Sequence, residues 1–140
     1  MKLVDANVLL YAANTAAAQH GPSVRWLNAA LSGTEGIGFA WSVMLAVVRV
    51  ATHPSAFVRP LSASDAIGLV QEWLAQPPSL VVTPTARHLD LLAGLLREAG
   101  TGGNLVPDAH LATLALEYDA TIVSFDRDFG RFRGLRLEVP

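Results

Sequence analysis

The sequence predicts an α/β fold: a three-layer α/β/α domain with a mostly parallel central sheet. Short apolar runs alternate with longer segments whose apolar residues recur at helical spacing, which is typical of parallel strands covered by helices on both faces. The chain has 140 residues, the length of one domain, and 51% of them are hydrophobic, which is enough for a dry core. No repeat, linker or low-complexity segment interrupts it. We therefore expect residues 1–140 to form a single domain.

The amino-terminal half is predicted to contain two strands and three helices. Residues 2–4 form a short strand that ends at an aspartate, and the asparagine that begins residues 7–15 is a favoured helix N-cap. Residues 22–31 carry apolar side chains on one helical face, and glycines separate them from the apolar run at 37–40. Residues 41–51 are apolar nearly all round, so we expect a buried helix there.

The carboxy-terminal half continues the same alternation. Residues 62–76 open with Ser-Ala-Ser-Asp, a capping-box pattern, and stop at two prolines, which predicts a helix. The apolar run at 80–82 predicts a third strand, and residues 84–99 predict an amphipathic helix that a glycine closes. A further helix is expected over residues 107–118 after a glycine-rich turn. The last two strands are expected at residues 121–124 and 135–139.

Composition excludes several kinds of site and of protein. Cysteine is absent, which excludes disulfides, thiolate zinc sites and cysteine nucleophiles. A carboxylate at position 5 leaves no apolar core for an export signal, and the apolar stretch at 36–48 is shorter than the ~20 residues of a membrane-spanning helix. We therefore expect a soluble cytoplasmic protein without membrane contact. The formal charge of −2 argues weakly against nucleic-acid binding, although four of the ten basic residues lie in the last 14 positions.

Aspartates follow the predicted strands at the points where a ligand would bind. Asp5 ends the first strand, and Asp126 and Asp128 follow the fourth. Asp108 lies in the first turn of a predicted helix. Ligands of open parallel sheets bind beyond the carboxyl ends of the strands, and helix starts can lie on the same rim. Three separate segments can therefore direct carboxylates to one place.

Each aspartate also has a purely structural explanation. Asp108 can be a favourable charge at a helix start, and Asp126 and Asp128 can be turn residues. Asp5 is harder to explain in this way, because it interrupts an apolar strand that would otherwise run directly into a helix. Clustered carboxylates repel one another, so they need a proton or a cation, and Mg²⁺ or Mn²⁺ suits oxygen ligands. Such a site can polarise a phosphate and activate a water, which is the chemistry of phosphodiester hydrolysis.

Three motifs resemble those of PIN-domain ribonucleases, in particular the VapC toxins of bacterial toxin–antitoxin pairs. Residues 3–7, Leu-Val-Asp-Ala-Asn, resemble the opening motif of the family, and residues 108–112, Asp-Ala-His-Leu-Ala, resemble its aspartate-bearing helix start. Residues 124–129, followed by Phe132 and Gly134, resemble its C-terminal motif. The resemblance implies a PIN-like fold and a Mg²⁺-dependent endoribonuclease, with Mn²⁺ as a substitute. It also implies an RNA substrate, a homodimer and a cognate antitoxin that silences the enzyme.

The resemblance implies roles for individual residues. The catalytic, metal-binding acids would be Asp5, Asp108 and Asp126, with Asp128 as an outer member. Asn7 and Ser124 would support them by hydrogen bonding. A glutamate of the family normally stands where this chain has Val47, and no acid occurs between Gly36 and Ser64. This departure keeps open the alternative of a catalytically weakened PIN-like module that binds RNA or a protein partner without cutting.

The arginines near the C-terminus have two interpretations. Guanidinium groups match phosphate oxygens, so these side chains can hold RNA, or they can form a solvated face, and both interpretations stand. They are Arg127, Arg131, Arg133 and Arg136. The four histidines show no metal-ligand spacing and are interpreted as ordinary residues. Receiver domains and haloacid-dehalogenase-type phosphatases also gather acids at strand ends, but both imply a lysine late in the chain, and Lys2 is the only lysine.

Overall fold

The computed structural model describes all residues, 1–140, and contains a five-stranded sheet in the order β3-β2-β1-β4-β5. Every neighbouring pair of strands is parallel, so the predicted parallel sheet is confirmed. The strands are β1 (Lys2–Val4), β2 (Ile37–Ala40), β3 (Ser79–Val82), β4 (Thr121–Val123) and β5 (Arg136–Glu138). All five coincide with predicted strands to within one or two residues.

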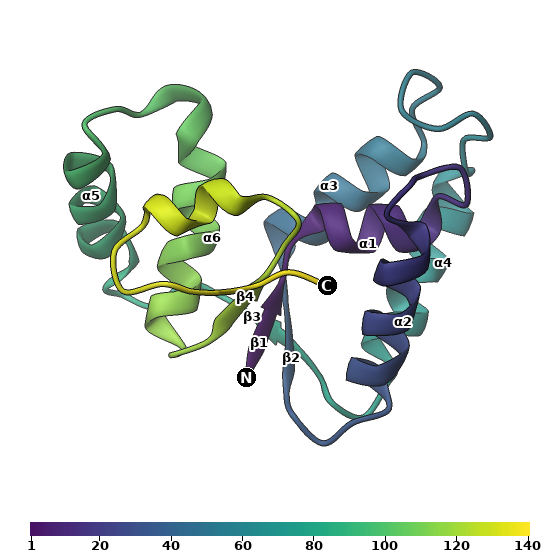
Figure 1. Cartoon of the computed structure of the whole chain (residues 1–140), viewed down its shortest axis with the longest axis horizontal. Helices are drawn as coiled ribbons and strands as arrows, with labels where there is room; N and C mark the ends of the chain where they lie inside the picture. The colour runs from purple at the N-terminus through teal and green to yellow at the C-terminus, as the bar shows by residue number, and fades with distance from the viewer.

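Six α-helices cover the two faces of the sheet, which confirms the predicted three layers. Figure 1 shows α1 to α4 on one side of the sheet and α5 with α6 on the other. The helices are α1 (Ala6–Ala13), α2 (His20–Leu31), α3 (Trp41–Ala51), α4 (Ala63–Leu74), α5 (His88–Ala99) and α6 (Val106–Glu117). Two short 3-10 turns complete the chain, η1 (Gly103–Leu105) and η2 (Arg127–Arg131). No helix combines the length and the apolar character that crossing a bilayer requires.

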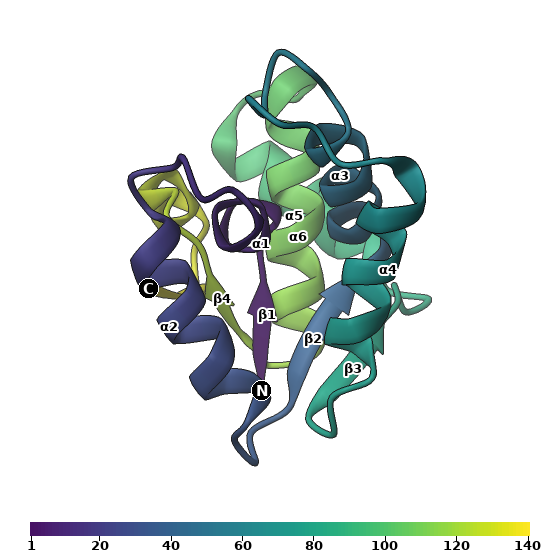
Figure 2. The ribbon, with the colours of Figure 1, turned by 90° about the vertical axis from the view of Figure 1, so that its right-hand side faces the viewer.

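The core is one continuous cluster of buried apolar residues around the central strands. In β1, Leu3 and Val4 are buried, and all four residues of β2 are buried, as expected for strands covered on both faces. Figure 2 shows β1 and β2 pointing toward the same end of the molecule, where α1 begins and where α6 also begins. The fold therefore brings two helix starts to the carboxyl rim of the sheet.

Two local predictions are wrong in detail. Asp5, not Asn7, caps α1: its Oδ1 accepts a hydrogen bond from the backbone N–H of Ala6 at 2.6 Å, and Asn7 already lies in the helix. The apolar helix α3 is not buried all round, because Trp41 and Leu45 are 58% and 62% exposed. Its inner face is buried as predicted, and its outer face is an apolar surface.

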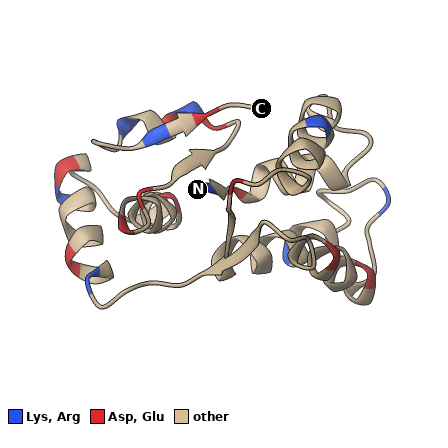
Figure 3. Cartoon of the chain, turned by 90° about the horizontal axis from the view of Figure 1, so that it is seen from below, with Lys and Arg blue, Asp and Glu red and all other residues tan.

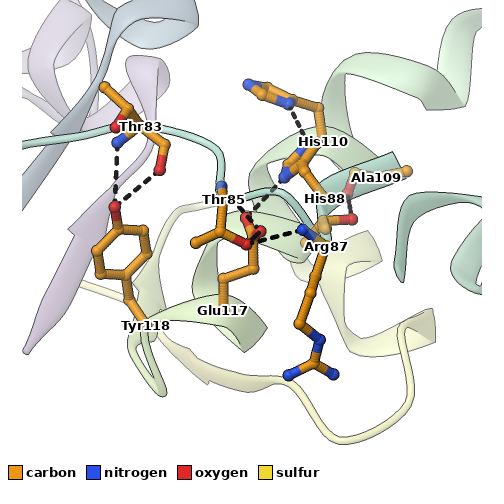
Figure 4. A network of polar contacts seen from close by, with 9 residues as sticks. Thr83, Thr85, Arg87, His88, Ala109, His110, Glu117 and Tyr118 are labelled. Atoms are coloured by element: carbon orange, nitrogen blue, oxygen red, sulfur yellow. Dashed lines mark hydrogen bonds and ion pairs between the residues drawn. The ribbon is translucent and has the colours of Figure 1, made fainter. Parts of the chain in front are cut away.

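A polar network between α5 and α6 was not anticipated from the sequence (Figure 4). Glu117, at the end of α6, accepts hydrogen bonds from the backbone N–H and the hydroxyl of Thr85. His88 lies against the same carboxylate through Nδ1, and its Nε2 lies 2.8 Å from Nδ1 of His110. These contacts explain why α5 begins at His88 and not at residue 84, since the segment before it bonds to α6 instead. Two of the four histidines therefore form a pair that no sequence spacing indicated.

Candidate active site

Asp5 occupies the junction between the central strand and the first helix. Its backbone N–H continues the sheet by donating to the carbonyl of Val123 at 3.0 Å, so the residue lies at the carboxyl end of β1 beside the end of β4. Its extended backbone, with φ −83° and ψ 154°, ends the strand and starts α1. The carboxylate can therefore cap the helix through one oxygen and present the other to a neighbour.

That neighbour is Ser124, the first residue after β4. Its hydroxyl donates to Oδ2 of Asp5 at 2.7 Å and accepts from the side-chain amide of Asn7 and the backbone N–H of Asp126, both at 2.9 Å. Asn7 also accepts from the backbone N–H of Phe125 at 3.2 Å. Ser124 is completely buried and every hydrogen-bonding position on its oxygen is used, so these contacts join the start of α1 to the turn after β4.

Asp126 and Asp128 occupy different positions in that turn. Asp126 caps η2, because its Oδ1 accepts from the backbone N–H of Asp128 at 2.8 Å. The side chain of Asp126 is half-buried, whereas the side chain of Asp128 is 74% exposed and lies 3.5 Å from Arg131. Asp126 thus belongs to the inner part of the rim and Asp128 to its outer edge.

Asp108 approaches the same rim from the other side of the sheet. It lies in the first turn of α6, behind Pro107, and η1 leads into that helix. A carboxylate in the first turn is favoured by the partial positive charge of the helix start, so its position has a local cause. The helix begins at the end of the molecule to which β1 points (Figure 2), and this brings Asp108 toward Asp5.

The charges of these acids act on one another. Burial raises the pKa of Asp5, the hydrogen bonds from Ser124 and Ala6 oppose that rise, and the charges of Asp108 and Asp126 add to it. Burial also raises the pKa of Asp108, and the charge of Asp126 adds to this effect. Each of these shifts includes a contribution from the charge of another acid, so Asp5, Asp108 and Asp126 lie within electrostatic range of one another at the rim and are called the acid cluster.

The donor chemistry of the cluster fits a hard divalent cation. All donors are carboxylate oxygens, their mutual repulsion would be relieved by positive charge, and Ser124 orients the most buried of them. No three His, Cys, Asp or Glu side chains lie close enough to enclose an ion by themselves. A cation that retains several waters, as Mg²⁺ does, needs no closed cage of protein ligands. The position of the missing family glutamate, Val47, is completely buried in α3 and offers no oxygen.

The chain is similar in sequence to proteins of one family. A family model for the PIN domain matches residues 2–135. The chain is 57% identical to ribonuclease VapC37 of Mycobacterium tuberculosis over all 140 residues and 97% of that protein, and 39% identical to ribonuclease VapC33 of the same species over 98% of that protein.

Among solved structures, the chain superposes on the sarcin-ricin loop cleaving toxin VapC20 of Mycobacterium tuberculosis with a TM-score of 0.70 and 17% identity, covering 97% of this chain and 99% of that one. The superposition on VapBC2 from Rickettsia felis, bound to a promoter DNA fragment, gives 0.69 and 18% identity, with 99% and 97% covered. At identities of 17% and 18%, these similarities show the fold alone. The family model and the full-length relatives carry the conclusion: the chain belongs to the PIN-domain family and, within it, to the VapC ribonucleases.

Proposed function

We propose that this protein is a Mg²⁺-dependent endoribonuclease that acts as the toxin of a toxin–antitoxin pair. The observation that carries the proposal is the hydrogen-bonded link from Asp5 through Ser124 to the turn at Asp126 at the carboxyl rim, with Asp108 in the first turn of α6. The ribonuclease names of relatives that align over the full chain support the same activity.

The residues of the cluster would divide the work in the following way. Asp5, Asp108 and Asp126 would bind the cation together with waters, since these side chains do not enclose an ion by themselves. The cation, when bound, supplies Lewis-acid polarisation of the phosphate and lowers the pKa of water. Ser124 keeps the Asp5 carboxylate facing the cluster by donating to one of its oxygens. Asn7 keeps the Ser124 hydroxyl in that orientation, because the side-chain amide of Asn7 donates to the hydroxyl oxygen of Ser124. These two contacts orient the Asp5 carboxylate before any ligand binds.

Cleavage of RNA by the purified protein tests the proposal. We expect cleavage of bulk tRNA or ribosomal RNA with Mg²⁺ or Mn²⁺, loss of cleavage with EDTA, and recovery when Mg²⁺ is restored in excess. Asp5→Asn and Asp126→Asn should each lower the rate by about 100-fold or more, because each removes a charged oxygen from the site. Cleavage that persists in EDTA and in both variants would show that the acid cluster does not cut RNA.

We further propose two protein partners, a second copy of the chain and an antitoxin. The VapBC2 structure from Rickettsia felis and the VapBC-1 structure from Haemophilus influenzae, both similar in fold, support the antitoxin. The chain also has an apolar groove of about 410 Å³ between α3 and α4, lined by Trp41, Met44, Leu45, Ile67, Val70 and Leu74 among others. A groove of this composition suits an apolar helix or segment of another chain.

A second candidate function for this sequence is that of a module that binds RNA or a protein partner without cutting RNA. Val47 favours it, because a completely buried valine stands where the family places an acid. The cleavage assay separates the two. If RNA binds and is not cut at any concentration of Mg²⁺ or Mn²⁺, the module is the better description.

A further inference from the structure

The arginines of the C-terminal segment do not share one environment. Arg136 begins β5 opposite Thr121, at the amino end of the strands, and its guanidinium lies 2.9 Å from the carboxylate of Asp119. That end of the sheet is opposite to the acid cluster. Arg131 closes η2, the turn that Asp126 caps at the carboxyl rim. Figure 3 shows that this segment carries both basic and acidic residues.

Two buried aromatic side chains fix the backbone at Arg131. Phe129 and Phe132 are 2% and 4% exposed, and their ring centroids lie 6.2 Å apart. Arg131 lies between them in the chain, so its backbone cannot leave the rim without bringing an aromatic ring into water. The side chain of Arg131 itself is 45% exposed. The guanidinium is therefore anchored near the acids and remains open to a ligand.

Asp128 contacts this guanidinium from the outer side. Nη2 of Arg131 lies 3.5 Å from Oδ2 of Asp128, a single contact that leaves most of the five N–H donors of the fork free. Asp128 is the acid that contacts Arg131 directly, and Arg131 ends the same turn whose N-cap is Asp126.

A site made of carboxylates repels the phosphates of its own substrate, so a cation of the protein is useful beside the metal. The only lysine cannot supply it, because Lys2 lies at the amino end of β1 and is paired with Glu138 at 2.8 Å. Arg131 has the required position, and guanidinium groups form paired hydrogen bonds to phosphate oxygens.

We propose that Arg131 binds the RNA backbone at the phosphate being cut or the one next to it, and that Asp128 positions this guanidinium and is not a metal ligand. The inference rests on the proposed function, since it concerns the same site. It assigns the outer edge of the rim, where Asp128 and Arg131 lie, to substrate binding and the inner acids to the cation. Arg127 and Arg133, exposed and without an ion pair in the structure, contribute only general attraction.

RNA binding by matched variants tests Arg131. The probe is a fluorescein-labelled single-stranded RNA of mixed sequence, titrated by anisotropy in EDTA so that cleavage does not interfere. Arg131→Gln should weaken binding about tenfold and reduce the slope of log Kd against log salt by about 0.7, the value for one phosphate contact of a single strand. Arg127→Gln, the same substitution in the same turn, should stay within about twofold. Equal losses in the two variants, or none in Arg131→Gln, would overturn the assignment.

Metal binding and kinetics test Asp128. Asp128→Asn should leave the affinity for Mn²⁺, measured by calorimetry without RNA, unchanged, whereas Asp126→Asn should weaken it. In cleavage assays Asp128→Asn and Arg131→Gln should both raise KM, and the double variant should be no worse than Arg131→Gln alone, because the two residues act through one contact. A loss of Mn²⁺ affinity in Asp128→Asn equal to that in Asp126→Asn would make Asp128 a ligand.

A wild-type protein that binds RNA without cutting it would refute the proposed function and leave the Arg131 binding test valid. If Arg131→Gln leaves KM unchanged but prevents binding of a protein partner, the guanidinium serves that partner.

Discussion

His88 Nδ1 lies 2.7 Å from Oε2 of Glu117, and both side chains are almost completely buried between α5 and α6. Because the carboxylate can only accept, His88 donates through Nδ1, and its Nε2 is left to share a proton with Nδ1 of His110 (Figure 4). One proton fits between these two nitrogens. If both histidines were protonated, Nε2 of His88 and Nδ1 of His110 would both be donors and could not bond to each other. This contact between α5 and α6 therefore requires that one of the two histidines is neutral.

The first prediction concerns the response of this network to acid. Burial raises the pKa of Glu117, but hydrogen bonds from His88 and Thr85 outweigh it and hold the pKa below its usual 4.5. Burial and the neighbouring His88 lower the pKa of His110 below 6.5. Both groups bind protons less readily in the folded chain, so both contribute stability that is present at neutral pH. This stability should fall from about pH 6.5 downward, first through His110 and below pH 4.5 through Glu117.

Thermal unfolding from pH 7.5 to 4 measures this effect, with Glu117→Gln and His110→Phe as variants. Glu117→Gln should lower the unfolding free energy at pH 7 by about 1–3 kcal/mol, since it leaves buried donors poorly satisfied. His110→Phe should lose less stability between pH 7 and 5 than the natural protein does. Parallel pH profiles for the natural protein and both variants would exclude the network as the source of acid sensitivity.

The second prediction concerns Asp5, whose pKa is raised mainly by burial. A carboxyl whose pKa is raised on folding destabilises the fold at any pH above 3.8, its pKa in the unfolded chain. The destabilisation grows with pH until the pH exceeds the pKa of the carboxyl in the folded chain. Asp5→Asn removes that charge, so the metal-free variant should melt higher than the natural protein at pH 7, by about 2–4 °C for each kcal/mol gained. The difference should vanish near pH 3.5. Cleavage should be lost although the protein is more stable.

Ser124→Ala is the matched control, because it removes the hydrogen bond that favours the charged form of Asp5 and keeps the carboxylate. It should melt lower than the natural protein and lose part of its activity. If Asp5→Asn melts lower than the natural protein, capping of α1 by the charged side chain outweighs the cost of burying it.

The sequence predicted that Asp5 and Asp108 lie at the carboxyl rim because their positions follow from local rules. Asp5 interrupts an apolar strand, and Asp108 opens a helix, so secondary structure alone assigns both to the carboxyl rim. The hydrogen bond of Ser124 to Asp5 spans 119 positions and could be anticipated only from the family motif. Its geometry follows from the pairing of β1 with β4, which aligns Val4 with Val123.

Side chains whose roles depend on tertiary packing could not be separated in the sequence. Arg131 and Arg136 lie five positions apart in one basic segment, yet residues 132–135 return the chain to the opposite end of the sheet, where Arg136 begins β5. His88 and His110 belong to different helices, and only the antiparallel packing of α5 on α6 brings their rings together. In both cases the position of the side chain depends on how the chain runs between secondary-structure elements, and the spacing of residues in the sequence does not indicate that path.

The third prediction concerns the apolar outer face of α3. Leu45 is 62% exposed beside the groove between α3 and α4, where a homodimer or an antitoxin would cover it. We expect light scattering to give twice the 14.9 kDa of the chain at micromolar concentration, and Leu45→Glu to give the monomer. Leu89→Glu is the control, because Leu89 is 76% exposed on α5 and lies outside this groove. A dimer that both variants preserve would place the interface elsewhere, and a natural protein that is only monomeric would contradict the homodimer.

The last prediction concerns Val47, the position of the absent glutamate. Fewer charged ligands mean weaker binding of hard cations, so we expect weak Mg²⁺ binding without RNA. Val47→Glu should tighten Mn²⁺ binding about tenfold if α3 faces the cluster at this point, because the introduced carboxylate adds one charged oxygen ligand. The side chain of Val47 is completely buried, so the same change should cost at least about 2 kcal/mol of stability in the metal-free protein. Saturating Mn²⁺ should restore part of that loss, since a ligand that binds only the folded state stabilises it.

Two controls separate metal binding from a general effect of the substitution. Val47→Gln has nearly the same shape without the charge, and should cost stability without tightening Mn²⁺ binding. Val43→Glu places the same carboxylate one turn earlier, at a residue that is 4% exposed, and should not respond to Mn²⁺. Burial raises the pKa of a carboxyl, so Mn²⁺ binding to Val47→Glu should also release more protons than binding to the natural protein. Calorimetry in two buffers of different ionisation enthalpy measures this release. The alternative outcome is that Val47→Glu folds but binds Mn²⁺ with unchanged affinity and releases no additional protons. Position 47 would then not face the cation, and Val47 would match the family glutamate in the alignment but not in space.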